Sequence, residues 1–403
     1  MRPTVTIAFD LSLAGAGDFF TLDDPTKGLL GGSVYTLAGD ILEDVSDDVR
    51  SVTVRRGRAS ETTRVDTGTA NVVLDNTSRL YDPTAAASVS VYGPSIIPRK
   101  AINIDINGEY LFRGQVEDWD LQYARGGDSV TIAKAADGFA LLGQRDYSAS
   151  FAGATGFSGS VIYDSASVAG WPLGKIDVDT GNAVIGAHDV EAATNVLSYL
   201  QEISASEPGL LFINKEGVLR FRSRTASQAP TGTVFADDGT GIPFRTIEID
   251  YGTELLYTRA EVEWTGGTVT AENSESIEDY GVTTVEVKTL LGTSGDAQVL
   301  ADFLVQRYGQ PLLRIASLGL EMNALTAAQQ TEVLGLELGD GVEIKFTPNG
   351  IGDPIERTVV VDSIRHDINP NRHEVTFEFS QTLASLILDD TEQGILDENT
   401  LGF

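Results

Sequence analysis

The 403-residue sequence contains no cysteine. Without thiols the chain can form no disulfide framework, zinc–thiolate site or cysteine nucleophile. Histidine is also scarce, with three in the whole chain. The short sequence patterns typical of zinc metalloproteases, serine hydrolases and P-loop nucleotide-binding proteins do not occur. We therefore expect no cofactor and no enzymatic activity.

Basic residues and long apolar runs are few as well. The chain has 28 Lys and Arg against 59 Asp and Glu, a formal charge of −31. Binding to a phosphate backbone needs a cationic surface, so general nucleic-acid binding is excluded. No run of 18 uninterrupted apolar residues exists, which excludes a transmembrane helix. At the N-terminus, Val5, Ile7 and Phe9 alternate with other residues and predict a strand rather than a signal peptide.

Alternating apolar residues are what the sequence has in abundance. They recur along the segment 50–123, at Val52 and Val54, at Ala70, Val72 and Leu74, and at Ile102, Ile104 and Ile106. This period of two predicts strands with one buried face. Asn107-Gly108 favours a tight hairpin turn, because both central residues of a type I′ turn need positive φ. The segment therefore predicts antiparallel strands joined by hairpins.

The middle of the chain has a different pattern. Residues 147–174 are rich in Ser, Ala and Gly, which is typical of a linker or an irregular crossing into a second domain. A helix is predicted from about Val190 to Ser204, with Asp189 as its N-cap, followed by a hairpin around 214–217. A helix backed by a hairpin indicates a small α+β layer.

In the last third of the chain, the residue pattern predicts helices followed by strands. Ser294 is the expected N-cap of one helix, and Thr326 with Gln329 predicts a capping box for another. Glu272, Glu275, Glu278 and Asp279 are expected on an acidic loop. The predicted strands cover residues 342–346, 358–364 and 373–379.

Two groups of motifs resemble known phage proteins. Arg56-Gly57-Arg58, Gly68, Leu74-Asp75-Asn76, Tyr81-Asp82-Pro83 and Phe112-Arg113-Gly114, in this order, resemble the minor tail proteins of long non-contractile-tailed phages that infect actinobacteria. The second group comprises Arg307-Tyr308, residues 338–342 and Asn369-Pro370, and it resembles the third domain of tail-tip (baseplate) hub proteins.

The resemblance implies a mainly β fold with a few helices (α+β). It would contain two tail-tube-like antiparallel β-barrel or sandwich domains and a smaller α+β domain. The implied boundaries are 1–146 for an N-terminal tube-like hub domain, 147–240 for a linker and small α+β domain, 241–385 for a second tube-like domain with a helix, and 386–403 for an acidic tail. A length of 403 residues fits two to four domains.

The resemblance also implies a structural role in the virion. The chain would be a homotrimeric hub at the tail tip of a siphovirus, assembled in the host cytoplasm, that caps or extends the tail tube. Its partners would be the distal tail protein, the tape-measure protein and other minor tail proteins, with only indirect contact with the host surface. Phage DNA would pass through an acidic channel without specific binding. The alternatives are a hexameric distal tail ring protein and a receptor- or glycan-binding tip protein.

Six residues are predicted at a subunit or partner interface: Arg55, Arg56, Arg58, Arg64, Tyr81 and Asp82. The planar guanidinium of arginine suits bidentate pairing with a carboxylate. In a chain this acidic, we expect the arginine cluster to pair with the acidic edge of a neighbouring subunit. A solvated face is the alternative.

A remote alternative is an aspartic peptidase that uses Asp66 and Asp179. Asp66-Thr67-Gly68 and Asp179-Thr180-Gly181 resemble the two half-sites of pepsin-type enzymes, in which two carboxylates share a proton. The hydrophobic pair that precedes each aspartate in that family is missing. Since Asp and Gly are also typical turn residues, turn formation is the favoured interpretation.

Metal binding has weak candidates. Residues 177–182 hint at a calcium loop, but Gly181 is the fifth residue of this run and His188 stands at the twelfth position, where an EF-hand needs glycine sixth and glutamate twelfth. His366 and His373 flank a turn and are expected to meet as a surface pair rather than as a metal site.

Overall fold

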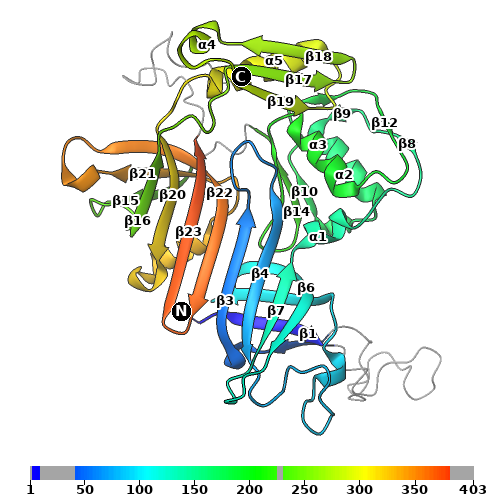
Figure 1. The fold of residues 1–403 in the computed structure, drawn as a ribbon, viewed down its shortest axis with the longest axis vertical. Helices are drawn as coiled ribbons and strands as arrows, with labels where there is room; N and C mark the ends of the chain where they lie inside the picture. Colours follow the sequence, from blue (N-terminus) through cyan, green and yellow to red (C-terminus); the bar gives the residue numbers. More distant parts are fainter. Residues whose placement is uncertain (1, 10–40, 225–229, 382–403) are drawn as a thin grey trace.

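A computed structural model describes residues 2–9, 41–224 and 230–381. Its main feature is a thirteen-stranded sheet that runs through the length of the molecule (Figure 1). Eleven strands follow the order β16-β20-β23-β22-β3-β4-β7-β6-β5-β1-β2, and β21 and β15 branch from β22. The mainly β fold class predicted from the sequence is confirmed. The acidic segment 386–403 lies outside the described residues.

The sheet combines strands from both ends of the chain. Its N-terminal strands are β1 (Thr4–Phe9), β2 (Ile41–Asp44), β3 (Val49–Gly57), β4 (Asp66–Asp75), β5 (Lys100–Ile106), β6 (Glu109–Gln122) and β7 (Val130–Ala136). Its later strands are β15 (Pro230–Ala236), β16 (Thr246–Asp250), β20 (Arg314–Glu321), β21 (Gly341–Phe346), β22 (Ile355–Asn369) and β23 (Arg372–Gln381).

The two halves of the sheet meet where β3 pairs with β22. This pairing is antiparallel, and it places Val54 opposite His366 and Gly57 opposite Ser363. Figure 1 shows β3 beside β22 at the centre of the molecule. The two β units expected near the ends of the chain therefore share one continuous sheet, and the domain boundaries given above stay a prediction.

Local turn signals were predicted correctly. Asn107 and Gly108 have φ values of 55° and 87° between β5 and β6, as a type I′ turn requires. In β1, Val5, Ile7 and Phe9 are buried, which confirms the predicted N-terminal strand.

The middle unit packs helices beside a hairpin. It contains α1 (Gly138–Gly143), α2 (Ser158–Val168), α3 (Val196–Ala205), the strands β13 (Leu210–Ile213) and β14 (Leu219–Arg222), and β10 (Ile176–Val178) parallel to β14. Short strands form two further pairs, β8 (Phe151–Ala152) with β12 (Asp189–Val190) and β9 (Gly156–Phe157) with β11 (Val184–Ile185).

Two predictions for this unit were wrong. The segment 147–174 is not a plain linker, because it contains α2, whose Val161, Ile162 and Ala166 are buried. The predicted helix starts six residues later than expected, at Val196. Asn195 is its N-cap and accepts the backbone N–H of Ser198, since Asp189 belongs to β12.

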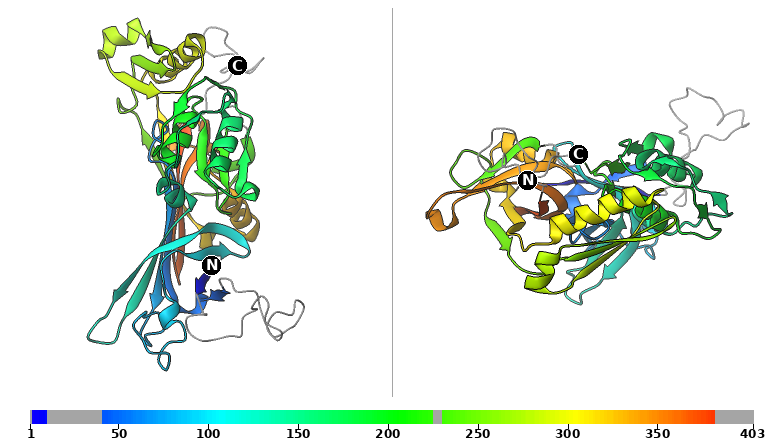
Figure 2. Two further views of the ribbon diagram at one scale, coloured as in Figure 1. Left: turned by 90° about the vertical axis from the view of Figure 1, so that its right-hand side faces the viewer. Right: turned by 90° about the horizontal axis from the view of Figure 1, so that it is seen from above.

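A third unit has its own core at one end of the elongated molecule (Figure 2). The helix α5 (Ser294–Tyr308) packs on a three-stranded sheet of β18 (Gly267–Glu272), β17 (Arg259–Trp264) and β19 (Thr284–Lys288). Most of the expected acidic loop is helical, as α4 (Ser274–Tyr280), and the N-cap of α5 is Thr293 rather than Ser294.

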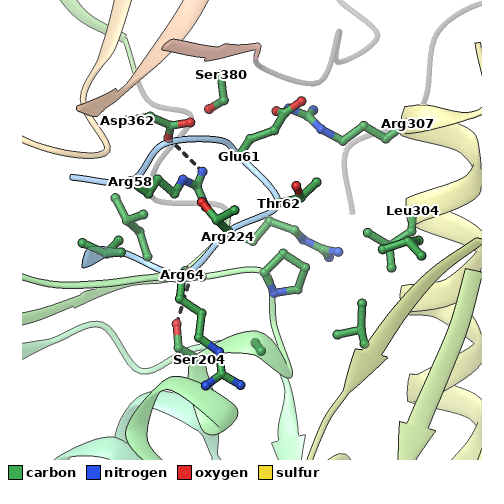
Figure 3. A pocket seen from close by; sticks show the side chains of 18 of the residues that line it. Arg58, Glu61, Thr62, Arg64, Ser204, Arg224, Leu304, Arg307, Asp362 and Ser380 are labelled. Atoms are coloured by element: carbon green, nitrogen blue, oxygen red, sulfur yellow. Dashed lines mark hydrogen bonds and ion pairs between the residues drawn. The ribbon is translucent and has the colours of Figure 1, made fainter. Parts of the chain in front are cut away.

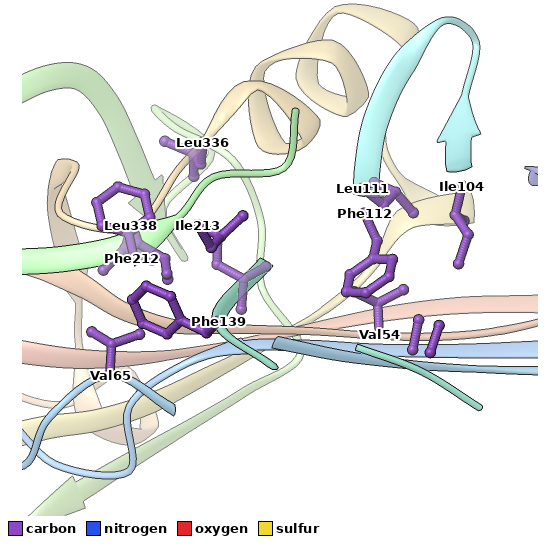
Figure 4. Close-up of a cluster of buried hydrophobic side chains, with 14 of the residues drawn as sticks. Val54, Val65, Ile104, Leu111, Phe112, Phe139, Phe212, Ile213, Leu336 and Leu338 are labelled. Carbon is purple, nitrogen blue, oxygen red and sulfur yellow. The ribbon is translucent and has the colours of Figure 1, made fainter. Parts of the chain in front are cut away.

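The main core runs from the sheet into the middle unit. In Figure 4, Phe139, Phe212 and Leu338 gather near Val65, and Phe112 lies over Val54. The helix α6 (Ala327–Gly335) begins at the predicted capping box of Thr326 and Gln329. Single 3₁₀ turns lie at Ser46–Asp48, Gly93–Ser95, Leu173–Lys175, Met322–Ala324 and Pro348–Gly350. Among the described helices, none has the length and apolar character needed to cross a membrane.

Candidate functional site

The arginine-rich end of β3 makes a buried ion pair with a loop of the C-terminal half. Arg56 is 3% exposed, and its Nη1 donates to Glu337 Oε1 at 2.6 Å. Oε1 of Glu337 also accepts the backbone N–H of Leu338 at 2.8 Å, and its Oε2 accepts the backbone N–H of Lys215 at 2.9 Å. The Glu337 carboxylate therefore connects β3, the β13–β14 hairpin and the loop after α6.

A second ion pair extends this connection. Arg222 on β14 donates through Nη1 to Asp340 Oδ1 at 2.8 Å, and the other carboxylate oxygen of Asp340 accepts the backbone N–H of Glu337 at 2.8 Å. Leu338-Gly339-Asp340 was recognised in the sequence as part of a hub-like motif. In this structure the motif holds the middle unit against the sheet.

Gly57 and Arg58 form a close contact between the sheet halves. Gly57 has a φ of 118°, and a Cβ there would lie 2.1 Å from the carbonyl oxygen of Asp362. Arg58 donates its backbone N–H to that oxygen at 3.0 Å and its Nη2 to Asp362 Oδ1 at 2.8 Å. Burial raises the pKa of the Asp362 carboxyl, and the charge of Arg58 counteracts this effect.

A cavity of about 300 Å³ opens beside this contact, where the sheet, the middle unit and the third unit meet (Figure 3). Arg58 and Arg64 line it from the β3–β4 loop, and Arg307 lines it from α5. Arg307 Nη2 donates to Glu61 Oε2 at 2.6 Å. We name this space the junction cavity.

Tyr81 and Asp82 lie elsewhere, beyond the opposite end of β4. Both are buried, and the Tyr81 hydroxyl donates to Asp48 Oδ2 at 2.6 Å. Asp82 accepts hydrogen bonds from Arg79 and Thr84. Burial raises the pKa of the Asp82 carboxyl, but these hydrogen bonds and one from Tyr123 outweigh burial and lower the pKa below its ordinary value.

The structure therefore separates the six predicted interface residues. Arg55 and Arg64 are exposed, Arg58 is half-buried, and Arg56, Tyr81 and Asp82 are buried within their own chain. The hydrogen bonds and ion pairs described above join these three buried residues to other residues of the same chain. An interface role stays a prediction for the exposed arginines. Sequence reasoning missed Glu337 and Asp362, the carboxylates that pair with Arg56 and Arg58.

The aspartate pair lacks the arrangement of a peptidase dyad. Asp66 is exposed at the start of β4, whereas the Asp179 carboxylate accepts the backbone N–H of Ser223 at 2.9 Å. Within residues 2–9, 41–224 and 230–381, no hydrogen bond joins Asp66 to Asp179, as a shared proton requires. In the same ranges no group of three or more acidic or histidine side chains could hold a metal ion. Asp177 of the possible calcium loop pairs with Arg220.

The expectation of a surface histidine pair was wrong. His366 and His373 are buried between β22 and β23, with His366 Nδ1 3.1 Å from His373 Nε2. Burial lowers the pKa of both rings, that of His373 to about 4. For His366, the charges of Arg56 and Lys215 add to this effect.

This pair predicts a loss of stability in acid. In the unfolded chain each ring takes up a proton below pH 6.5, whereas folded His373 stays neutral down to about pH 4. The stabilisation is complete above pH 6.5 and falls as the pH drops, by about 2 kcal/mol for His373 at pH 5. We expect the double variant His366→Gln/His373→Gln to lose less stability than the native chain between pH 7.5 and pH 5 in urea unfolding.

Comparing the double variant with the native chain also cancels the contribution of Asp137, whose pH dependence is opposite to that of the histidines. Burial raises the pKa of the Asp137 carboxyl to about 7, so Asp137 contributes stability that grows as the pH falls. Asp137 is present in both proteins, and its contribution cancels. Equal losses in the two proteins would contradict the role assigned to the histidines.

Solved structures of phage tail proteins have a similar fold. The 43 kDa tail protein of prophage MuSo2 from Shewanella oneidensis has a TM-score of 0.58 at 14% identity, over 94% of this chain and 98% of that chain. The tail protein from Neisseria meningitidis MC58 has a TM-score of 0.58 at 10% identity, over 85% of this chain and 94% of that chain. The chain has the fold of phage tail proteins.

A third tail-like structure comes from a secretion system. A type VI secretion component of E. coli, described as structurally similar to the T4 bacteriophage tail proteins gp27 and gp5, has a TM-score of 0.50 at 10% identity. The alignment covers 83% of this chain and 74% of that chain. No protein-family model and no curated protein matches the sequence. The resemblance to actinobacteriophage proteins stays a prediction.

Proposed function

We propose that this chain is a structural subunit of a siphophage tail tip, a hub that assembles in three copies around the tail axis. The tail-protein fold along 94% of its length carries this proposal. In the assembly the hub caps or extends the tail tube, and it joins the distal tail protein and the tape-measure protein.

A free sheet edge supplies the physical basis for assembly. Among the described strands, β16 pairs only with β20, and four of its five residues are exposed. Unpaired edge strands offer their backbone groups to another chain, and natural proteins protect them with proline, lysine or bulges. The β16 sequence TIEID has neither proline nor lysine, and at its register shift with β20 the extra residue, Ala316, belongs to β20. The outer edge of β16 is therefore suited to pair with a strand of a neighbouring copy.

Exposed apolar side chains adjoin the same edge. Ile249 and Tyr251 are 36% and 72% exposed, and Leu312 and Leu313 just before β20 are 41% and 38% exposed. Apolar groups concentrated at one place on a surface mark interaction sites. We assign this patch and the β16 edge to one subunit interface.

The negative charge fits a channel for DNA. A wall that carries much of the −31 charge of each copy repels phosphates, so DNA slides past without binding, although salt limits this repulsion to about 8 Å at physiological ionic strength. A reconstruction of the assembly with a neutral or basic lumen would contradict the channel.

If copies of the chain pair through the outer edge of β16, a substitution on this edge should block assembly and leave the fold intact. N–H groups along an edge strand point alternately to its partner strand and away from it. Glu248→Pro removes one N–H group from β16 and places on it a proline, which edge strands tolerate and which hinders further strand pairing. We expect the native chain with its tail neighbours to form trimers in mass measurements, and Glu248→Pro to remain monomeric with an unchanged circular dichroism spectrum.

Glu248→Thr is the matched control, because it removes the charge but keeps the N–H group, and it should still assemble. Six copies would favour the distal ring alternative over the hub. A native chain that stays monomeric beside its neighbours at virion-like concentration would overturn the proposal.

A further inference from the structure

We propose that the junction cavity binds the acidic C-terminal segment of its own chain, residues 382–403. This inference does not depend on the tail-tip function, since it concerns a contact within one chain. It rests on the position where the described chain ends, on the charge of the cavity wall and on the sequence of the segment.

The described chain ends at the cavity. Gln381, the last residue of β23, is one of the residues that line it. Arg307, which also lines the cavity, donates through Nη2 to the backbone carbonyl of Gln381. The Gln381 side chain donates to the carbonyl of Leu313. These bonds fix the start of the C-terminal segment at the cavity wall.

The wall is cationic in a strongly acidic protein. Arg58, Arg64, Arg224, Lys288 and Arg307 line the cavity, against three acidic side chains. Glu61 and Asp362 are already paired with Arg307 and Arg58, and Lys288 is paired with Glu202 at 3.2 Å. Within the described residues Arg64 makes no ion pair, and the buried Arg58 Nε has no hydrogen-bond partner. Arg64 is therefore available to pair with a further carboxylate.

The other side of the cavity is apolar. Val285 and Val287 of β19 and Leu300, Phe303 and Leu304 of α5 contribute to it. The guanidinium carbon of Arg224 lies 4.9 Å from the centre of the Phe303 ring, at the border between the two kinds of wall. A volume of about 300 Å³ is at the lower limit of ligand pockets and suits a few side chains rather than a whole domain.

The C-terminal segment carries groups that suit both walls of the cavity, with apolar residues followed by acidic ones. Leu386, Ile387 and Leu388 come first, and Asp389, Asp390 and Glu392 follow, with no lysine or arginine from residue 382 to the end. Seven residues separate Gln381 from Asp389, and the eight steps between these two residues span roughly 26 Å in extended form. This length is sufficient for the apolar residues to reach the apolar wall and for a carboxylate to reach Arg64.

The absence of cysteine in the native chain makes a crosslinking test direct. Full-length protein with Ala205→Cys, which lines the cavity at the end of α3, and Leu388→Cys is treated at high dilution with a short bis-maleimide. We expect an intramolecular crosslink to form at least about tenfold faster than in the matched control, because binding raises the local concentration of the tail. Mass spectrometry of tryptic peptides identifies the product.

The control pairs Leu388→Cys with Ala192→Cys, an exposed alanine before α3 that does not line the cavity. Adding Asp389→Asn, Asp390→Asn and Glu392→Gln to the cavity pair should remove the rate difference, as should adding Arg64→Ala. Equal rates for the cavity and control positions would overturn the proposal. Crosslinks between chains without intramolecular product would also overturn it, in favour of a second copy as the occupant.

Discussion

Arg56→Ala is expected to lower the free energy of unfolding by about 3–5 kcal/mol, because it leaves the Glu337 carboxylate buried without its cation. Glu337 is 9% exposed and would keep only backbone N–H donors. Arg56 Nη1 and Glu337 Oε1 connect residues 281 positions apart, so the loss weakens the contact between both halves of the sheet and the middle unit. Equilibrium unfolding in guanidinium chloride measures the change.

Arg55→Ala is the matched control for this prediction. Arg55 is the neighbouring residue on β3 and is exposed, so its replacement should change stability by less than about 0.5 kcal/mol. An Arg56→Ala protein that keeps native stability but fails to assemble would show that Arg56 serves a subunit interface instead. Equal destabilisation by the two substitutions would also contradict the internal role.

The buried position of Arg56 was readable from the sequence. Val52, Val54 and Arg56 occupy alternate positions of one strand and share its buried face, whereas Arg55 is out of phase with them. Grouping the arginines by composition alone concealed this difference. Strand phase therefore distinguishes a buried arginine, which must have a partner, from an exposed one.

The partner of Arg56 was not predictable in the same way. Turns and caps such as Asn107-Gly108 and Thr326–Gln329 depend on residues a few positions apart, so the sequence displays the whole interaction. The pairing of β3 with β22 joins residues about 300 positions apart, and many strands have the same alternating pattern. A single sequence does not say which of them are neighbours.

The helices α2 and α3 show a second limit, since α2 was not predicted and the start of α3 was placed too early. The segment of α2 is rich in Ser, Ala and Gly, which is typical of a loop, yet tertiary packing buries Val161 and Ile162 in the main core. For α3, both Asp189 and Asn195 are suitable N-caps. The choice between them is made by β12, which pairs Asp189 with Ala152 and keeps that stretch extended.

Gly57→Ala should have the largest effect of any single methyl addition at the junction. The new Cβ would lie 2.1 Å from the Asp362 carbonyl oxygen and 2.5 Å from the Ser363 Cα, and both are backbone atoms that cannot rotate away. The φ of 118° adds conformational strain of about 1–3 kcal/mol. We expect a loss above about 4–5 kcal/mol, the range that marks a specific structural failure, or no soluble protein.

Gly127→Ala separates the steric part of this effect from the conformational part. Gly127 also has a positive φ, 87°, but a Cβ there meets nothing within 4 Å. Its replacement should therefore cost only the strain, about 1 kcal/mol. If Gly57→Ala costs no more than Gly127→Ala in guanidinium unfolding, the backbones of β3 and β22 are not in close contact at this position. A large difference between the two variants would show that the backbones of β3 and β22 approach closely at Gly57, next to the Arg58–Asp362 ion pair.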